Sequence, residues 1–385
     1  MAPCGGVAAL VDTFDDDSLS PHWQSSDGGG ATIKESQGRL SLTVAPTNLT
    51  YAQVGSQYAY NFTNRSVSVE VVSVPLEPAK IRAGLFVFAA DANDNLEMGI
   101  HDNKLFWGYR YGAITTSLGS TDYDAVTHRW WRIRTDATYA YFDVSADGDN
   151  WTALAQVPLT KIMPLQYVRT AMAIQRIDVG SSDDGVAFDN YNTQEVTEPY
   201  CPSSSFSDDF DAAMLGPGWY GWNVPGCSGS FTDGHYQLDI MANTAAYCGI
   251  RTAAAYDLTL DRLSVQVPVG HDSGVGRTAQ LTATSADGDF VTLAHVGPTL
   301  SFSYVSQANY YFVDSTNYDP VLHKYWSLRE AAGMLYFETS SNGKSWVTRG
   351  SIPTPFAMDT IQVSLEGGTE ANAEPTRIAF DDYNL

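Results

Sequence analysis

Residues 66–71 read Ser-Val-Ser-Val-Glu-Val, a strict alternation of polar and apolar side chains. An extended strand turns successive side chains to opposite faces, so this period of two predicts a strand with one buried face. The same apolar positions recur 196 residues later, at 263–267. Similar alternation occurs at 40–44 and 105–111, whereas no segment has the periodicity of a long helix. The pattern therefore predicts an all-β fold and indicates an internal repeat.

The repeat extends over most of the chain. Trp23 recurs as Trp219, and the ending Ala-Phe-Asp-Asn-Tyr-Asn at 187–192 recurs as Ala-Phe-Asp-Asp-Tyr-Asn at 379–384. Turn clusters rich in Gly, Asp and Asn separate apolar runs of roughly 5 to 9 residues, which is typical of a sandwich of antiparallel sheets. Two homologous copies of one β-sandwich explain both observations.

A length of 385 residues fits two domains of ordinary size. We expect two tandem antiparallel β-sandwich domains at 1–192 and 206–385, joined by a linker at 193–205 that is rich in Ser, Pro, Thr and Glu. With 44% apolar and 17% charged residues, the chain has enough apolar surface to form packed cores.

The charge balance excludes some partners. The chain has 21 Lys and Arg against 44 Asp and Glu, a net charge of -23. Such a protein repels nucleic acid and anionic lipid, so we expect neither as a partner. No apolar run approaches the roughly 20 residues that span a bilayer, which predicts no membrane insertion. The start Met-Ala-Pro-Cys-Gly-Gly has no basic segment typical of a secretion signal, although a signal that had been removed would leave the same picture.

Two longer patterns occur in both copies and in the same order. Tyr-Asp-x-x-x-His-x-x-Trp-x-x-Arg begins at Tyr123 and Tyr318, and Tyr-Phe-x-x-Ser-x-x-Gly-x-x-Trp begins at Tyr141 and Tyr336. With the closing Ala-Phe-Asp, they make the chain resemble the concanavalin A-like lectin/glucanase jelly rolls, which include laminin-G-like modules. The resemblance implies two curved sheets in each domain and ligands on the concave face. The opening Asp-Thr-Phe-Asp-Asp at 12–16 also resembles modules of the minor tail proteins of tailed phages.

Catalytic residues are not evident. Retaining glucanases of the resembled family carry Glu-x-Asp-x-x-Glu on one strand, since two carboxylates must lie about 5 Å apart, and neither copy has that pattern. Three glutamates of the first copy are replaced in the second: Glu35, Glu70 and Glu97 become Phe231, Gln266 and Thr292. The Gly-, Asn- and Ala-rich stretch with Glu366, Glu370 and Glu374 reads as a loop. No Gly-x-Ser-x-Gly occurs, and His128 and His323 are interpreted as structural. We therefore expect a protein that is not an enzyme.

Acidic residues gather at the two ends of each copy. First and last strands of jelly rolls commonly lie side by side, so these carboxylates could converge and bind Ca²⁺, which prefers oxygen ligands. The candidate metal ligands are Asp15, Asp16, Asp189, Asp209, Asp211 and Asp381. The alternative is that these groups cap turns and face solvent. No cofactor is required by the sequence.

Aromatic and arginine residues that differ between the copies are candidates for a ligand site or an interface. Phe106 and Arg110 correspond to Ser301 and Val305 in the second copy. The second copy has Tyr310, Tyr311 and Phe312, without aromatic counterparts in the first. Exposed aromatics of this kind favour binding of a glycan or of another protein subunit.

Four cysteines can form two disulfides. We expect Cys4 to pair with Cys201, which would join the ends of the first copy, and Cys227 to pair with Cys248, which would staple neighbouring strands. Such bridges indicate an oxidising environment. Four buried free thiols are the alternative.

Two functional classes follow. The first is a non-enzymatic virion protein, a phage minor tail protein that binds host surface glycans, neighbouring tail subunits or further copies of itself. The second is a secreted bacterial carbohydrate-binding protein or glycoside hydrolase, located outside the cell. We prefer the first because the chain starts at Met1 without a leader.

Overall fold

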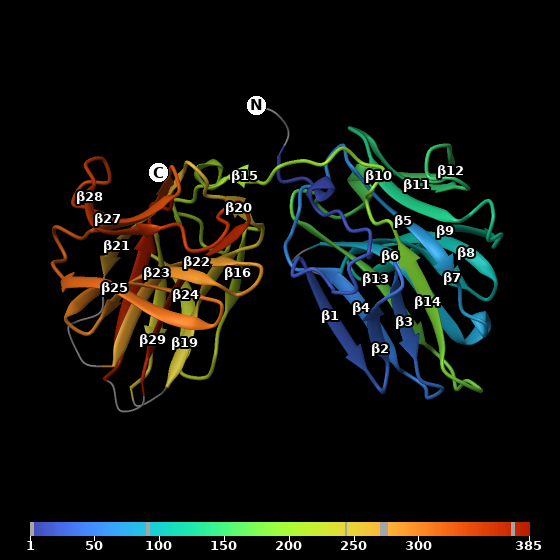
Figure 1. Cartoon of the computed structure of the whole chain (residues 1–385), viewed down its shortest axis with the longest axis horizontal. Helices are drawn as coiled ribbons and strands as arrows, with labels where there is room; N and C mark the ends of the chain where they lie inside the picture. Colours follow the sequence, from blue (N-terminus) through green and yellow to red (C-terminus); the bar gives the residue numbers. More distant parts are fainter. Residues whose placement is uncertain (1–3, 90–92, 243–244, 270–275, 371–373) are drawn as a thin grey trace. The chain divides into compact units, whose positions relative to one another are not determined.

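The computed structural model describes residues 4–89, 93–242, 245–269, 276–370 and 374–385. The chain divides into two compact units, Met1–Pro199 (unit 1) and Tyr200–Leu385 (unit 2), coloured blue to green and green to red in Figure 1. Part of the expected linker belongs to unit 2, because β15 (Cys201–Pro202) pairs with β20 (Tyr256–Asp257) of that unit.

Unit 1 contains two seven-stranded sheets. Sheet A1 consists, in spatial order, of β1 (Trp23–Gly28), β4 (Tyr51–Ser56), β13 (Val168–Arg176), β6 (Ile81–Ala89), β7 (Asn95–His101), β8 (Lys104–Tyr111) and β9 (Ile114–Asp122). Sheet B1 consists of β12 (Trp151–Pro158), β11 (Tyr139–Ser145), β10 (Trp130–Thr135), β5 (Ser66–Ser73), β14 (Asp184–Asp189), β3 (Leu40–Val44) and β2 (Thr32–Glu35).

Unit 2 repeats this arrangement. Sheet A2 consists of β16 (Trp219–Trp222), β19 (Ala246–Thr252), β29 (Ile361–Thr369), β22 (Arg277–Ser285), β23 (Phe290–Val296), β24 (Thr299–Ser306) and β25 (Asn309–Asn317); in addition, β20 pairs with β29, and β15 pairs with β20. Sheet B2 consists of β17 (Cys227–Thr232), β18 (His235–Ile240), β30 (Thr376–Asp381), β21 (Arg262–Val269), β26 (Tyr325–Ala331), β27 (Met334–Ser340) and β28 (Val347–Pro353).

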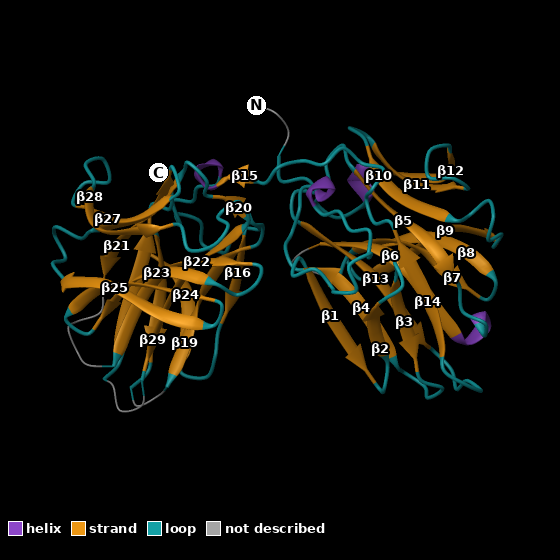
Figure 2. Ribbon diagram, in the orientation of Figure 1, coloured by secondary structure: helices purple, strands orange, loops and turns teal. Residues whose placement is uncertain are grey.

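Helices are short in the described part of the chain, and strands dominate Figure 2. They are four 3₁₀ turns: η1 (Val7–Ala9), η2 (Pro78–Lys80), η3 (Leu159–Lys161) and η4 (Ser203–Ser205). None of these described helices has the length and apolar character needed to cross a membrane. The prediction of an all-β, jelly-roll sandwich fold is confirmed.

The core of each unit lies between its two sheets. On β5, Val67 and Val69 are fully buried, as their alternation predicts. The polar residues between and beside them are also covered: Ser68 is fully buried and Glu70 is 5% exposed. Glu70 accepts a hydrogen bond from Arg129 Nε at 2.6 Å, which supplies the partner that a buried carboxylate needs. The period of two thus identifies the strand correctly but does not mark a solvent-exposed face.

In each unit, one asparagine near the end of the copy hydrogen-bonds the start of the unit to its B sheet. Asn192 Nδ2 donates to the carbonyls of Val7 and Leu10 at 3.1 and 2.8 Å, and its Oδ1 accepts from Ser68 N at 2.9 Å. In unit 2, Asn384 makes the same three bonds, to the carbonyls of Ser203 and Phe206 and from Ser264 N, at 2.8, 2.9 and 2.7 Å. The repeated sequence ending therefore fastens the chain start of each unit to its B sheet.

The repeated Trp has an equally specific partner. Trp23 Nε1 donates to Asp12 Oδ2 at 2.8 Å, and Trp219 Nε1 donates to Asp208 Oδ2 at 2.8 Å. The histidines of the long pattern are structural too, since His128 Nδ1 accepts from the backbone N–H of Asp124 at 3.1 Å. Burial lowers the pKa of His128, which favours the neutral ring that this acceptor role requires.

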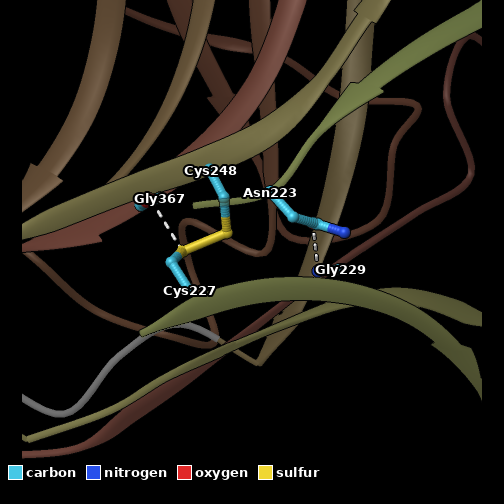
Figure 3. The surroundings of a disulfide bond; sticks show 5 residues. All are labelled: Asn223, Cys227, Gly229, Cys248 and Gly367. Atoms are coloured by element: carbon cyan, nitrogen blue, oxygen red, sulfur yellow. Dashed lines mark hydrogen bonds between the residues drawn. A yellow bond between two sulfur atoms is a disulfide. The ribbon is translucent and has the colours of Figure 1, made fainter. Parts of the chain in front are cut away.

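A disulfide joins the two sheets of unit 2 (Figure 3). Cys227 lies on β17 of sheet B2 and Cys248 lies on β19 of sheet A2, so the bond crosses the core instead of stapling neighbouring strands. The pairing is the expected one, and the geometry differs because these two strands are not adjacent in one sheet. Cys4 and Cys201 are disulfide-bonded as well, and no described cysteine is a free thiol.

Candidate functional site

The outer face of sheet A1 carries a trough. Strand register places small residues next to one another across its middle: Gly55 pairs with Ala171, Ala173 with Gly84, and Gly84 with Gly99. The alternate residues of these strands, such as Leu85 and Val87 of β6, are fully buried in the core. Because Gly55, Ala171 and Ala173 lack bulky side chains, the sheet surface is hollowed beside them.

Three adjoining cavities occupy this trough. The first, of about 230 Å³, lies over β4, β13 and β6 and is lined by Tyr51, Ala52, Gln53, Arg82, Phe86, Phe88, Ala173, Ile174 and Gln175. The second, of about 380 Å³, is lined by Gln24, Ser26, Gln53, Gly55, Ser56, Phe88, Asn93, Arg169, Thr170 and Ala171. The third, of about 340 Å³, is lined by Arg82, Glu97, His101, Phe106, Trp107, Thr115, Ser117, Gln175 and Ile177.

The cavities form one groove that crosses the sheet. Gln53 and Phe88 line both the first and the second cavity, and Arg82 and Gln175 line both the first and the third. Arg169 pairs with Phe88, and Gln175 pairs with Arg82, so the two arginines are six residues apart in register. Six residues of strand span about 20 Å. We call this feature the A1 groove; its length suits a chain-like ligand.

Aromatic rings form part of the groove wall. The rings of Phe86 and Phe88 are stacked, with centroids 5.4 Å apart and planes 13° from parallel. Farther along, the Arg82 guanidinium lies 4.6 Å from the centroid of Phe106. Flat rings of this kind bind the apolar C–H faces of sugar rings, while the amides of Gln53 and Gln175 can bind hydroxyl groups.

One carboxylate lines the groove. Glu97 is 8% exposed, and its Oε2 accepts from Arg82 at 2.6 Å. Glu97 is the single Asp or Glu among the residues that line the three cavities. The ion pair holds both side chains in the lining of the third cavity. Charged hydrogen-bonding groups held in this way can orient the polar groups of a bound ligand.

The corresponding face of unit 2 carries larger side chains at the trough positions. In strand register, the trough positions Gly55, Gly84 and Ala173 correspond to Arg251, Gln280 and Glu366. The ring positions Phe86 and Phe88 correspond to Thr282 and Thr284, and Phe106 corresponds to Ser301. The groove and its aromatic wall therefore belong to unit 1.

Glu366 corrects one interpretation made from the sequence. It lies on strand β29 and not in a loop, next to Gln280 of β22. Burial raises the pKa of Glu366, and hydrogen bonds with Thr282 and Gln280 partly offset the effect. The Gly-rich sequence around it was misleading because Gly367 and Gly368 are strand residues in a crowded part of sheet A2.

The four residues proposed from copy-specific chemistry fall into two places. Phe106 lines the A1 groove, and Arg110 lies four residues along β8, opposite Asn95. Tyr310 and Tyr311 lie on β25, the last strand of sheet A2, and are 64% and 44% exposed. Tyr311 stacks on Tyr304 with centroids 4.7 Å apart. An interface at Tyr310 and Tyr311 stays a prediction.

The opening and closing carboxylates do approach one another. Burial raises the pKa of Asp189 to about 6, and the charges of Glu70 and Asp15 add to the rise. Burial also raises the pKa of Asp381, with a smaller contribution from Asp211. Within the described residues, however, no group of three or more His, Cys, Asp or Glu side chains could hold a metal ion. Asp16 and Asp209 take other roles, accepting from the backbone N–H of Ser18 and Asp211. Calcium binding stays a hypothesis.

Asp16 also contacts a carboxylic acid of the first copy, Glu35, which has no acidic counterpart in the second. Burial and a hydrogen bond with Asp16 raise the pKa of Glu35 to about 7 from an ordinary value near 4.5. A raised carboxyl pKa contributes stability at acid pH that is lost as pH rises through the folded value. Folding of unit 1 is thus opposed by this charge above about pH 7.

We expect Glu35→Gln to raise the free energy of unfolding by about 2 kcal/mol at pH 8 and to leave it nearly unchanged at pH 4. The amide mimics the protonated acid and removes the charge repulsion. Urea titrations at both pH values measure the difference, with the exposed Glu370→Gln as control. Equal effects of Glu35→Gln at the two pH values would contradict the assignment.

Arginine–aromatic clusters on the B sheets are shared by both units. In unit 1, Arg132 and Arg134 both donate to Asp143 Oδ2, and their guanidinium groups lie over Trp151 and Tyr141. Unit 2 builds the same cluster around Glu338, from Arg262 and Arg329. Because the two copies retain the arrangement with arginines from different strands, we interpret it as structural support.

Most residues of the A1 groove were not predicted from the sequence. Arg82, Phe86 and Phe88 have Thr278, Thr282 and Thr284 as counterparts. The comparison between copies that singled out Phe106 could therefore have found them. The trough itself had no signal in the sequence, because Gly55, Gly84 and Ala173 become neighbours only through strand pairing.

Comparisons with known proteins bear on the fold. No protein-family model matches the chain, and no curated protein matches it. Among solved structures, the chain is similar to a laminarinase from Flavobacterium sp. UMI-01, at 11% identity and a TM-score of 0.38, over 46% of this chain and 98% of that one. It is similar to a lichenase from a mouse hindgut metagenome, at 13% identity and a TM-score of 0.37, over 47% and 96%. A glycoside hydrolase family 16 endo-glucanase from Bacteroides ovatus matches at 7% identity and a TM-score of 0.38, over 47% and 98%.

These neighbours correct the sequence-based expectation. They are glycoside hydrolases, so the expectation that the protein is not an enzyme is contradicted and is withdrawn. They match the concanavalin A-like jelly roll, whereas the resemblance to phage tail proteins is not supported by them. Each match covers about half of this chain and nearly all of the neighbour.

Proposed function

We propose that the protein is an extracellular carbohydrate-binding protein that holds a glycan chain in the A1 groove. The observation that carries the proposal is the continuous groove itself, with stacked Phe86 and Phe88 and the amides of Gln53 and Gln175. Sugars present apolar ring faces and polar edges, and this surface offers both kinds of partner.

The disulfides support a location outside the cell. Disulfides persist in oxidising compartments and are rare in the cytosol, and the described cysteines are all oxidised. The proposal therefore follows the secreted carbohydrate-binding alternative and not the phage tail protein that we preferred from the sequence.

Any cleavage of the bound chain would depend on Glu97. It is the carboxylate among the groove residues, and Arg82 holds it in place. Hydrolysis of the bound polysaccharide is therefore measured in addition to binding. Reducing-sugar release from a panel of polysaccharides is measured for the wild-type chain and for Glu97→Gln, and any turnover in the groove is expected to disappear in the variant.

Blocking the groove tests the binding site. We expect Gly55→Trp to weaken polysaccharide binding at least tenfold, because the indole would occupy the trough beside Ala171. A Cβ at Gly55 would meet no atom closer than 3.4 Å, so the backbone tolerates the change. Isothermal titration calorimetry with soluble polysaccharides measures the affinity, and thermal unfolding verifies that the variant is folded.

The matched control fills the corresponding position of unit 2. Arg251→Trp changes an exposed residue on sheet A2 and is expected to leave the affinity within about twofold. If Gly55→Trp binds as the wild type does, or if the two variants lose affinity equally, the A1 groove is not the binding site.

A further inference from the structure

The charge of the A1 groove is opposite to that of the chain. Acidic residues outnumber basic ones by 44 to 21 in the whole sequence. The groove lining reverses this ratio, with Arg82 and Arg169 against Glu97 alone. Arg110 adds a third guanidinium, on the same face of β8 as Phe106. Lys104 adds no net charge, because it forms an ion pair with Asp122 at 2.8 Å.

The guanidinium of Arg110 has hydrogen-bond donors that no described residue uses. It makes no hydrogen bond or ion pair with any residue that the structure describes, and its Nε is buried without a partner. An unpaired guanidinium that is partly buried is costly unless something binds it. Guanidinium groups match the oxygens of carboxylates and sulfates in geometry as well as charge.

The arginines are specific to unit 1. Arg82, Arg110 and Arg169 correspond in register to Thr278, Val305 and Gln362 of unit 2. None of the three counterparts is charged, whereas the B-sheet clusters of both units contain two arginines each, around Asp143 and around Glu338. The three arginines are therefore not shared between the copies, and Arg110 among them has no described partner within the fold.

We propose that the A1 groove recognises an anionic polysaccharide, one that carries carboxylate or sulfate groups along its chain. This inference rests on the proposed function and specifies its ligand. Arg82 serves one end of the groove, and Arg169 with Arg110 serves the other, about 20 Å away along the strands. Charged groups at intervals along a polymer can meet both ends, while Phe86 and Phe88 pack against the sugar rings between them.

The test compares charged and neutral polymers on the full chain. Calorimetry is run with polygalacturonate and alginate as carboxylated probes, carrageenan as the sulfated probe, and laminarin and mixed-linkage β-glucan as neutral probes. We expect at least one anionic polymer to bind at least tenfold more tightly than either neutral one. Its affinity is expected to fall as NaCl rises from 50 to 500 mM, because salt screens the charges.

Arg110→Gln provides the decisive variant, since it breaks no ion pair in the described structure. It is expected to weaken binding of the anionic polymer about tenfold and to leave neutral glucans within twofold. Arg251→Gln, on the corresponding face of unit 2, is the control and is expected to have no effect.

The two proposals fail in different ways. If neutral glucans bind as tightly as anionic ones and Arg110→Gln changes neither, the anionic ligand class is wrong while glycan binding stands. If no polysaccharide binds, or if Gly55→Trp has no effect on binding, the proposed function itself is wrong. Equal affinity for single-stranded DNA would show a general attraction for polyanions and would overturn the inference.

Discussion

Asn192→Ala is expected to lower the free energy of unfolding by about 3 kcal/mol. The side chain is fully buried and makes three hydrogen bonds, to the carbonyls of Val7 and Leu10 and from Ser68 N. Alanine would leave all three backbone groups without that partner in a buried place, and each such group costs about 1–3 kcal/mol. Differential scanning calorimetry of the full chain measures the loss.

The second copy supplies the control. Asn384→Ala removes the same three bonds from unit 2 and is expected to cause a loss of similar size. Asn190→Ala, two residues before Asn192, removes one hydrogen bond to Glu70 and is expected to cost about 1 kcal/mol. If Asn192→Ala changes stability no more than Asn190→Ala does, the closing role of Asn192 is refuted.

Removing the disulfide of unit 2 is expected to have an effect of comparable size. Cys227 and Cys248 are 21 residues apart, and a loop of that length gives about 3 kcal/mol of stabilisation by restricting the unfolded chain. The double variant Cys227→Ala, Cys248→Ala also loses the covalent link between sheets A2 and B2. We expect the unfolding temperature of unit 2 to fall by several degrees while that of unit 1 is unchanged.

Urea titration and calorimetry of the double variant measure this loss. Ser228→Ala, an exposed change beside Cys227, is the matched control. A stability change below about 0.5 kcal/mol in the double variant would mean that core packing alone holds these two sheets together.

The repeat made much of the fold predictable. Alternation at Val67 and Val69 identified a strand, and the recurrence of the whole pattern identified two sandwiches. Repeated residues such as Asn192 and Trp23 prove to have one structural role in both copies. Such residues are constrained by local contacts, which a sequence pattern reflects directly.

The groove was less predictable because it depends on register. Gly55, Ala171 and Phe86 are far apart in the sequence and adjacent only across β4, β13 and β6. Cys227 and Cys248 illustrate the same point, since their pairing followed from the sequence but the two sheets that they join did not. The glycines near Glu366 predict a loop, but pairing with Gln280 keeps this residue in a strand.

A structure of the full chain bound to the tightest polysaccharide fragment tests the central claim most directly. The account predicts sugar rings over Phe86 and Phe88, with anionic groups near Arg82 at one end of the A1 groove and Arg110 at the other. An oligosaccharide bound on sheet A2, or elsewhere on unit 1 with the A1 groove empty, would contradict it.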